Sequence, residues 1–237
     1  MKTAIITGAT SGIGKAIIEQ LIKKDYSIIA IGRNDQALAD LEALSPHVKA
    51  LKCDLSHNES IFSTIAYLRN NCERVSTLIH CAGVWHNNHK PLANMKLQDF
   101  TENEVLDTIS VGLTSFMLLV RALIPKMIQD ESSIIAISGT FENGGKGWLP
   151  YFVSKRGLED FMVGLADELK EANITANTIS PSDTATSAYK RFFPEYIEDS
   201  VHPASIAELA MELMTSKKTG ATLIVKKDSP LTEQFHG

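Results

Sequence analysis

Tyr151 and Lys155 are the two side chains whose types and spacing point most directly to chemistry. They lie four residues apart, so a helix would place both on one face. A free tyrosine has a pKa of about 10, which is too high for easy proton transfer at neutral pH. A nearby ammonium favours the phenolate and would lower that pKa. The pair therefore predicts a proton donor and acceptor for an alcohol or a ketone, although the same spacing also occurs by chance.

The strand-like run upstream of this pair ends in Ser138-Gly139-Thr140. The two hydroxyls of this segment are candidates for holding a substrate oxygen beside Tyr151. We expect Ser138 to take that role, with Thr140 as the alternative.

A second candidate site is the glycine-rich turn Thr7–Gly14, which joins a strand-like run to an amphipathic segment. The first N–H groups of a helix are unpaired, and the helix dipole favours an anion beside them. Gly8 would allow the tight turn, Gly12 a close approach to a pyrophosphate, and Gly14 close packing of helix on strand. The turn predicts a dinucleotide site; the alternative is an ordinary strand-to-helix turn.

The second strand-like run ends at Gly32-Arg33-Asn34, where an NAD-binding protein would carry an acidic residue. A guanidinium can hold a phosphate through two charge-assisted hydrogen bonds. Arg33 therefore favours NADP(H) over NAD(H), unless it is a solvated residue of the turn.

Two further strand ends carry candidate residues. Asp54 follows the third strand and is suited either to the adenine amino group or, with Ser56, to capping the next helix. The fourth strand ends in small residues, Ala82 and Gly83, that let a flat ring lie close. The histidines of the segment 85–89 could suggest a metal, but their spacing matches no standard zinc pattern. We expect no metal and place these histidines in a substrate cleft or in solvent.

The elements that must position these residues alternate between strand-like and helical runs. Such alternation predicts an α/β fold with one doubly wound, Rossmann-type parallel sheet and helices on both faces. Ligands of such sheets bind beyond the carboxyl ends of the strands, where the candidates fall. A long helix is expected over Glu102–Gln129. The expected strands are Ala4–Thr7, Ser27–Ile31, Lys49–Cys53, Thr77–Cys81, Ser133–Ser138, Thr175–Ile179 and Thr222–Val225.

Size and composition limit the classes of protein. A chain of 237 residues fits a single domain over 1–237. The net charge of −5 and the lack of a dense basic stripe argue against nucleic acid or an anionic membrane as partner. The apolar run Phe116–Ile124 contains Arg121 and ends at Pro125, so we expect no membrane span. Three cysteines without framework spacing suggest free thiols, hence a soluble cytoplasmic protein.

Taken together, these residues resemble the short-chain dehydrogenase/reductase family over Thr3 to about Val225. The combination of Thr-Gly-x-x-x-Gly-x-Gly with Tyr-x-x-x-Lys carries the resemblance. It implies that Tyr151 is the general acid/base, that Lys155 lowers its pKa and holds the nicotinamide ribose, and that Ser138 positions the substrate carbonyl. It also implies a variable substrate lid at about 187–202 and a homodimer or homotetramer. The cofactor-binding residues that it implies are Gly8, Thr10, Ser11, Gly12, Ile13, Gly14, Arg33, Asn34, Asp54, Leu55, Cys81, Ala82, Gly83, Tyr151, Lys155, Pro181, Ser182, Thr184 and Thr186.

Four departures from the family pattern set this chain apart. His80 and Gly112 stand where the family usually has asparagines; the backbone carbonyl at the second position binds a water in the proton relay, so Gly112 could keep part of that role. A strict alignment from the strand places the catalytic serine on Gly139. The family's Pro-Gly turn has become Pro181-Ser182.

The leading hypothesis is an NADP(H)-dependent enzyme that interconverts a carbonyl and an alcohol of a small-molecule substrate. The aromatic lid, with Tyr189, Phe192, Phe193 and Tyr196, suggests a partly apolar substrate. The alternative is a weak or inactive dinucleotide-binding sensor or scaffold on the same fold. A sugar-nucleotide epimerase or dehydratase is disfavoured because little chain remains beyond the last strand.

Overall fold

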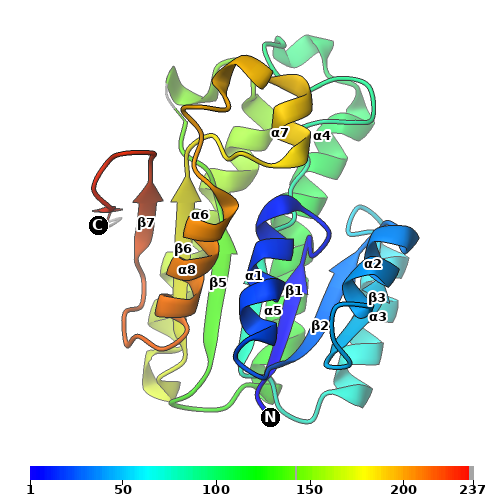
Figure 1. Ribbon diagram of the computed structural model, residues 1–237, viewed down its shortest axis with the longest axis vertical. Coiled ribbons are helices and arrows are strands. Elements are labelled where there is room, and N and C mark those ends of the chain that lie inside the picture. The colour runs from blue at the N-terminus through cyan, green and yellow to red at the C-terminus, as the bar shows by residue number, and fades with distance from the viewer. Residues whose placement is uncertain (142, 235–237) are drawn as a thin grey trace.

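An eight-stranded sheet forms the centre of the computed structural model, which describes residues 1–141 and 143–234 (Figure 1). Its strand order is β3-β2-β1-β4-β5-β6-β7-β8, and the first seven strands run parallel. The chain begins in the middle of the sheet, builds outward to β3 and then continues on the other side of β1. The strands are β1 (Thr3–Thr7), β2 (Ser27–Gly32), β3 (Val48–Lys52), β4 (Thr77–His80), β5 (Ser133–Ile137), β6 (Thr175–Pro181), β7 (Thr222–Val225) and β8 (Thr232–Gln234).

The expected fold class is confirmed, and each expected strand is present within a residue or two of its predicted ends. The strands form because runs of isoleucine, valine and leucine are buried on both faces, as for Ile5 and Ile6 of β1. The short edge strand β8, which pairs antiparallel with β7, was not predicted. Its residues are polar, and so carry no apolar pattern.

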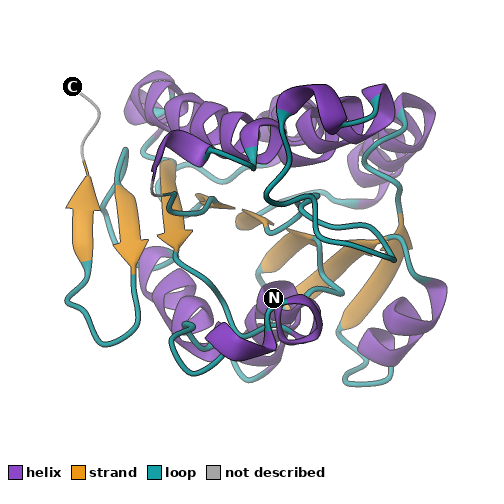
Figure 2. Cartoon of the chain, turned by 90° about the horizontal axis from the view of Figure 1, so that it is seen from above, coloured by secondary structure: helices purple, strands orange, loops and turns teal. Residues whose placement is uncertain are grey.

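Helices cover both faces of the sheet (Figure 2). One buried apolar cluster joins the sheet to α1, α2 and α8, and another joins it to α3, α5 and α6. The helices are α1 (Gly12–Ile22), α2 (Asp35–Glu42), α3 (Asn58–Asn71), α4 (Glu102–Ile109), α5 (Ser115–Leu123), α6 (Leu149–Glu168), α7 (Ser187–Phe192) and α8 (Pro203–Leu213). Short 3-10 turns lie at Leu97–Asp99, Ile124–Lys126, Asn143–Gly145, Lys170–Ala172 and Pro194–Tyr196.

The expected long helix is present but is not uniform. A π-helical turn, Ser110–Thr114, separates α4 from α5, and the helical run ends at Lys126 rather than Gln129. A Cβ on Gly112 would lie 2.9 Å from Ser154 Oγ, so the missing side chain lets this turn pack closely on α6. Gly112 therefore has a packing role at the place where the helix is locally unwound.

By length and composition alone, the run Glu102–Lys126 could cross a membrane. The expectation of no span rested on the shorter run Phe116–Ile124, with Arg121 inside it and Pro125 after it; the helical run in the structure is longer. Half of its most apolar window is buried inside the fold, however, and the core helix of a soluble protein passes the same test. One such helix is weak evidence for a membrane span.

Candidate active site

A cavity of about 1000 Å³ opens at the carboxyl ends of the strands. Figure 1 shows α7 above these strand ends. The cavity brings together the glycine-rich turn, the Arg33 turn and the Tyr151–Lys155 pair. Of the residues expected at the site, those that line it are Gly8, Thr10, Ser11, Gly12, Ile13, Arg33, Asn34, Leu55, Cys81, Ala82, Gly83, Ser138, Tyr151, Lys155, Pro181, Ser182, Thr184 and Thr186. Gly14 and Asp54 are not part of the lining.

The glycine-rich turn has the geometry that its sequence predicts. Gly8 has a φ of 63°, and a Cβ there would lie 2.6 Å from the Ala82 backbone nitrogen. A Cβ on Gly14 would lie 2.3 Å from the Gly8 carbonyl oxygen, so only glycine lets α1 start this close to β1. Ser11 caps α1 by accepting a hydrogen bond from the Gly14 N–H at 3.2 Å.

The N-terminus of α1 is open to the cavity through Gly12 and Ile13. A Cβ on Gly12 would meet the Thr186 side chain at 2.8 Å, so a side chain at this position would intrude between the turn and the β6–α7 loop. The donors of a helix N-terminus beside a cradle free of side chains fit the pyrophosphate of a dinucleotide.

Arg33 lines the cavity, and its side chain is exposed. Asn34 caps α2 by accepting a hydrogen bond from Ala37 N–H at 2.8 Å. Gly32 is tightly enclosed, because a Cβ would lie 3.1 Å from Thr10 Cγ2. The β2 end therefore offers a guanidinium and no carboxylate of its own.

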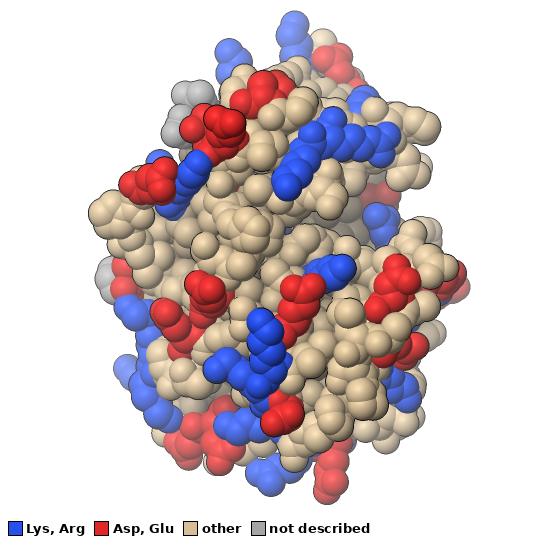
Figure 3. Space-filling view, viewed as in Figure 1, with Lys and Arg blue, Asp and Glu red and all other residues tan. Residues whose placement is uncertain are grey.

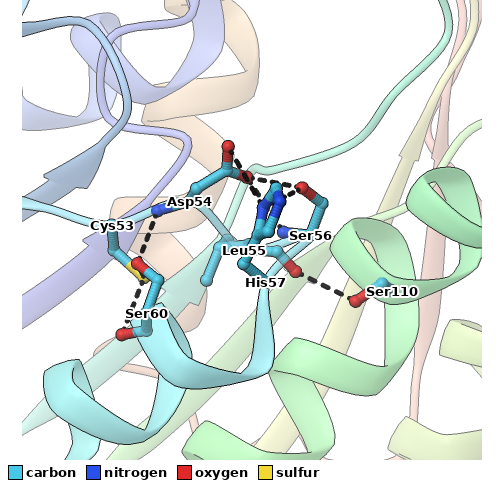
Figure 4. A network of polar contacts seen from close by, with 7 residues as sticks. All are labelled: Cys53, Asp54, Leu55, Ser56, His57, Ser60 and Ser110. Carbon is cyan, nitrogen blue, oxygen red and sulfur yellow. Dashed lines mark hydrogen bonds and ion pairs between the residues drawn. The ribbon is translucent and has the colours of Figure 1, made fainter.

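Asp54 is held by its own loop rather than turned into the cavity (Figure 4). Its carboxylate accepts hydrogen bonds from the Ser56 N–H and hydroxyl at 3.0 and 2.8 Å. Burial opposes ionisation, but these bonds and the charges of Arg33 and His57 outweigh it and lower the pKa of Asp54. Ser110 of the π turn donates to the Leu55 carbonyl at 3.0 Å and ties this loop to α4. The expected capping of α3 by Asp54 or Ser56 is wrong: the N-cap residue is His57, and its side chain makes no capping hydrogen bond. The adenine role of Asp54 stays a prediction.

Tyr151 and Lys155 share one face of α6, which begins just before them with Pro150 in its first turn. The Lys155 ammonium lies 5.4 Å from the centre of the Tyr151 ring. It donates to the Ile137 carbonyl at 2.7 Å and lies 3.5 Å from the Ala82 carbonyl. The pair is thus anchored to the ends of β4 and β5, beside the cavity.

The structure shows a second influence on the pKa of Tyr151, so the expected lowering by Lys155 stays a prediction. Burial raises the pKa of Tyr151, and it lowers the pKa of Lys155 to about 8 against the opposing effect of Cys81 and Glu159. The ammonium is engaged by backbone carbonyls, and the phenol loses solvation. At neutral pH Tyr151 is therefore a protonated phenol, which is the form that a proton donor requires.

Ser138 lines the cavity but is buried, and its hydroxyl is hydrogen-bonded to α6. The hydroxyl donates to Glu159 Oε1 at 2.7 Å and lies 3.2 Å from the Lys155 carbonyl oxygen. Glu159, which is 1% exposed, also pairs with Arg156. Glu159 lies one turn beyond Lys155, and its hydrogen bond with Ser138 ties α6 to the end of β5.

Thr140 and Gly139 occupy the next two places along the cavity wall. The Thr140 hydroxyl makes only a long contact of 3.4 Å with the Pro181 carbonyl. A Cβ on Gly139 would find only ordinary contacts, the shortest 3.6 Å to Phe141. The hydroxyl with the weaker internal partner is that of Thr140.

The family model described as short chain dehydrogenase matches residues 2–196. The chain belongs to this family. The chain is 26% identical to carbonyl reductase family member 4 of Xenopus laevis, over 94% of this chain and 96% of that one. It is 29% identical to the 3-oxoacyl-[acyl-carrier-protein] reductase FabG of Buchnera aphidicola, over 98% and 93% of the two chains. The crystal structure of gox2181 shares its fold, with a TM-score of 0.82, 21% identity, and coverage of 94% of this chain and 93% of that one.

His80, one of the departures of this short-chain dehydrogenase, is fully buried beneath the active site. Its Nδ1 shares a hydrogen bond of 2.7 Å with the Thr7 hydroxyl, and its ring stacks on Phe116 at 4.5 Å. Among the described residues Nε2 meets no partner in good hydrogen-bond geometry, although the Val111 and Gly112 backbone of the π turn lies close enough to oppose the lowering of the pKa of this ring. Burial, and then the charge of Lys155, lower the pKa of His80 to about 3, so the ring is neutral at neutral pH.

Several residues that line the cavity of this short-chain dehydrogenase were not expected at the site. The aromatic ones are Phe141 and Trp148, which flank the loop before α6. Trp85 lines the cavity as well and was not expected there. The histidines of the segment 85–89 had been placed in a cleft or in solvent; His86 lines the cavity and His89 does not. A tryptophan three residues before Tyr151 was a usable sequence clue. No group of three or more His, Cys, Asp or Glu side chains suited to a metal occurs within residues 1–141 and 143–234.

Burial of the Lys155 ammonium is expected to lower the stability of the folded protein. Between pH 8 and about 10.5 the unfolded chain holds the Lys155 proton and the folded one does not, so stability rises with pH there and is lowest below pH 8. We expect Lys155→Met to be more stable than the parent protein at pH 7, by on the order of 2 kcal/mol in the free energy of unfolding. The variant should also lack the rise in stability between pH 8 and about 10.5. Thermal unfolding without ligand from pH 7 to 10 measures both. Lys24→Met, on the surface, is the control. An equal gain in unfolding temperature at pH 7 in both variants would contradict the prediction.

Proposed function

We propose that this chain is an NADP(H)-dependent oxidoreductase that interconverts a carbonyl and an alcohol, with Tyr151 as the proton donor and acceptor. The observation that carries the proposal is the single cavity shared by the glycine-rich turn and the Tyr151–Lys155 pair. The family and its named relatives, a carbonyl reductase and a 3-oxoacyl reductase, support the reaction type.

The residues of this chain divide the work by position. The turn at Gly8–Gly14 would hold the pyrophosphate and Arg33 a 2′-phosphate, while Lys155 lies where it can reach the ribose beside Tyr151. When bound, the nicotinamide supplies or accepts hydride. Tyr151, protonated at neutral pH, gives its proton to the carbonyl oxygen as that oxygen gains negative charge.

Thr140 is the hydroxyl that we assign to the substrate oxygen. It lines the cavity, and its internal contact of 3.4 Å with the Pro181 carbonyl is weak. Ser138 is occupied by Glu159, so it is better suited to anchoring α6 on β5. This assignment replaces the family's serine with the alternative that the sequence left open.

The test is NADPH oxidation across a panel of ketones, aldehydes and 3-oxoacyl thioesters. We expect the protein to turn over at least one of these classes of carbonyl compound. Binding of NADPH with no turnover of any class would favour the alternative, a dinucleotide-binding sensor or scaffold. The observation that favours this alternative is the hydrogen bond of the Ser138 hydroxyl to Glu159, which occupies the family's serine.

Arg33 is expected to set the preference for NADP(H). Arg33→Ala removes the charge-assisted contact with the 2′-phosphate, so we expect KM for NADPH to rise about 10- to 100-fold while KM for NADH stays within about twofold. Steady-state kinetics with both cofactors measures this. Arg69→Ala on α3, outside the cavity, is the matched control. Equal changes for NADPH and NADH would remove the assignment.

We also propose a homodimer or homotetramer that acts in the cytoplasm. Leu106, Met117 and Val153 expose apolar side chains on α4, α5 and α6, which suits a contact between copies. Figure 3 shows acidic and basic side chains interspersed on the face that it draws, which does not suit a nucleic-acid partner. All three cysteines are free, which suits a reducing compartment. The mass in solution tests the oligomer.

A further inference from the structure

Four aromatic rings from three distant segments meet at the cavity wall: Trp85, Trp148, Tyr189 and Phe193, here called the aromatic cluster. Trp85 follows β4, Trp148 precedes α6, and the other two come from α7 and its end. Ring centres lie 6.5 Å apart for Trp85 and Trp148, 6.2 Å for Trp148 and Phe193, and 5.2 Å for Tyr189 and Phe193. These separations are typical of rings in direct contact.

The aromatic cluster continues to the catalytic tyrosine. Trp148 lies 6.3 Å from the Tyr151 ring, and Phe141 contacts the same ring at 5.7 Å, edge to face. A compound whose carbonyl reaches the Tyr151 hydroxyl therefore places its neighbouring atoms against ring faces and edges. The wall next to the reacting group is aromatic on both sides of Tyr151.

Of the residues that the structure describes, four cationic side chains and one carboxylate line the cavity, but none of them belongs to the aromatic cluster. Burial, and then the neighbouring Asp183 carboxylate, raise the pKa of Tyr189, so its phenol stays uncharged in the wall. Arg191 donates to the Asn88 carbonyl at 2.9 Å, and its guanidinium lies over Phe192. Lys146 is exposed to solvent. The charged residues that line the cavity are Arg33, Lys146, Lys155, Asp183 and Lys226.

We infer that the substrate is a flat, uncharged carbonyl compound with an aromatic ring next to the reacting carbon. Ring-on-ring contact gives such a compound an advantage over a saturated analogue of the same size. The aromatic cluster, rather than a charged group, would then orient the carbonyl toward Tyr151. The inference names the substrate class of the proposed function and rests on that function for the position of the reacting carbonyl.

The experiment compares acetophenone with cyclohexyl methyl ketone, which share one carbon skeleton but carry a flat aromatic ring and a puckered saturated ring, respectively. Binding to the protein with NADP⁺ is measured by calorimetry, or by quenching of Trp85 and Trp148, the only two tryptophans in the chain. We expect acetophenone to bind about three- to tenfold more tightly. Trp148→Leu should remove most of that difference and leave the affinity for NADP⁺ unchanged.

Phe62→Leu is the matched control, because this ring is exposed on α3 and outside the cavity. It should leave both ketone affinities unchanged. If Trp148→Leu does not fold, Phe193→Leu makes the same test from the opposite side of the aromatic cluster.

Equal affinity for the two ketones, or an unchanged difference in both cluster variants, would overturn the inference. Turnover of a 3-oxoacyl thioester without binding of acetophenone would also overturn it, while the proposed reductase activity would stand. Preferential binding of acetophenone with no turnover of any carbonyl would support the aromatic site and remove the proposed activity instead.

Discussion

Tyr151→Phe is expected to lower kcat for carbonyl reduction about 1000-fold, because it removes the proton that the developing alkoxide needs. The ring stays, so its contacts with Trp148 and Phe141 are kept. The Tyr151 side chain is half-buried in the cavity wall, and replacing it with an apolar ring of the same shape should preserve the fold. The affinity for NADPH should therefore change little. Single-turnover NADPH oxidation with a substrate from the carbonyl panel measures the rate.

The control for this prediction is Tyr67→Phe, on α3 and outside the cavity, which should keep the rate of the parent protein. A Tyr151→Phe rate within about threefold of the parent would mean that the proton comes from another group. The direction of reaction adds a second check. Because burial raises the pKa of Tyr151, the protein holds the proton donor ready at neutral pH, whereas alcohol oxidation needs the phenolate and should speed up as the pH rises.

The sequence was sufficient to predict the glycine-rich turn and the shared helix face of Tyr151 and Lys155, because both depend on backbone geometry. Gly8 needs a positive φ, and Gly14 must lie against the Gly8 carbonyl, so the residue types report the turn directly. The spacing of Tyr151 and Lys155 reports the helix face in the same way. Each of these features is local, and the parallel sheet then brings them together.

The polar contacts behind the site could not be predicted from spacing. Whether Ser138 faces the cavity or α6 depends on the buried carboxylate of Glu159, which comes 21 residues later and reaches β5 only when α6 is packed. The pKa of Tyr151 likewise depends on how much solvent the folded loops exclude and on which acceptors Lys155 finds. These are tertiary properties, and for Tyr151 burial acts in the direction opposite to that which a helical pair alone suggests.

His80→Asn is expected to remove much of the loss of stability that the parent protein suffers in acid. The unfolded chain binds a proton at His80 below pH 6.5, but the folded one does so only near pH 3. Between these values the unfolded state holds the extra proton, so stability falls as the pH falls, by about 1.4 kcal/mol per unit. From pH 6.5 to pH 4.5 the contribution of His80 is about 2 to 3 kcal/mol.

The test is the difference in unfolding free energy between pH 6.5 and pH 4.5, rather than stability at one pH. Asparagine can bond to the Thr7 hydroxyl but loses the stacking on Phe116, so the variant starts from a lower stability at neutral pH. That loss is the same at both pH values and cancels in the difference. His47→Asn, exposed before β3, should keep the full acid sensitivity of the parent. If the two variants lose equal stability in acid, His80 is already protonated or solvated in the folded protein, and its assignment as a neutral buried ring between β1 and the π turn is wrong.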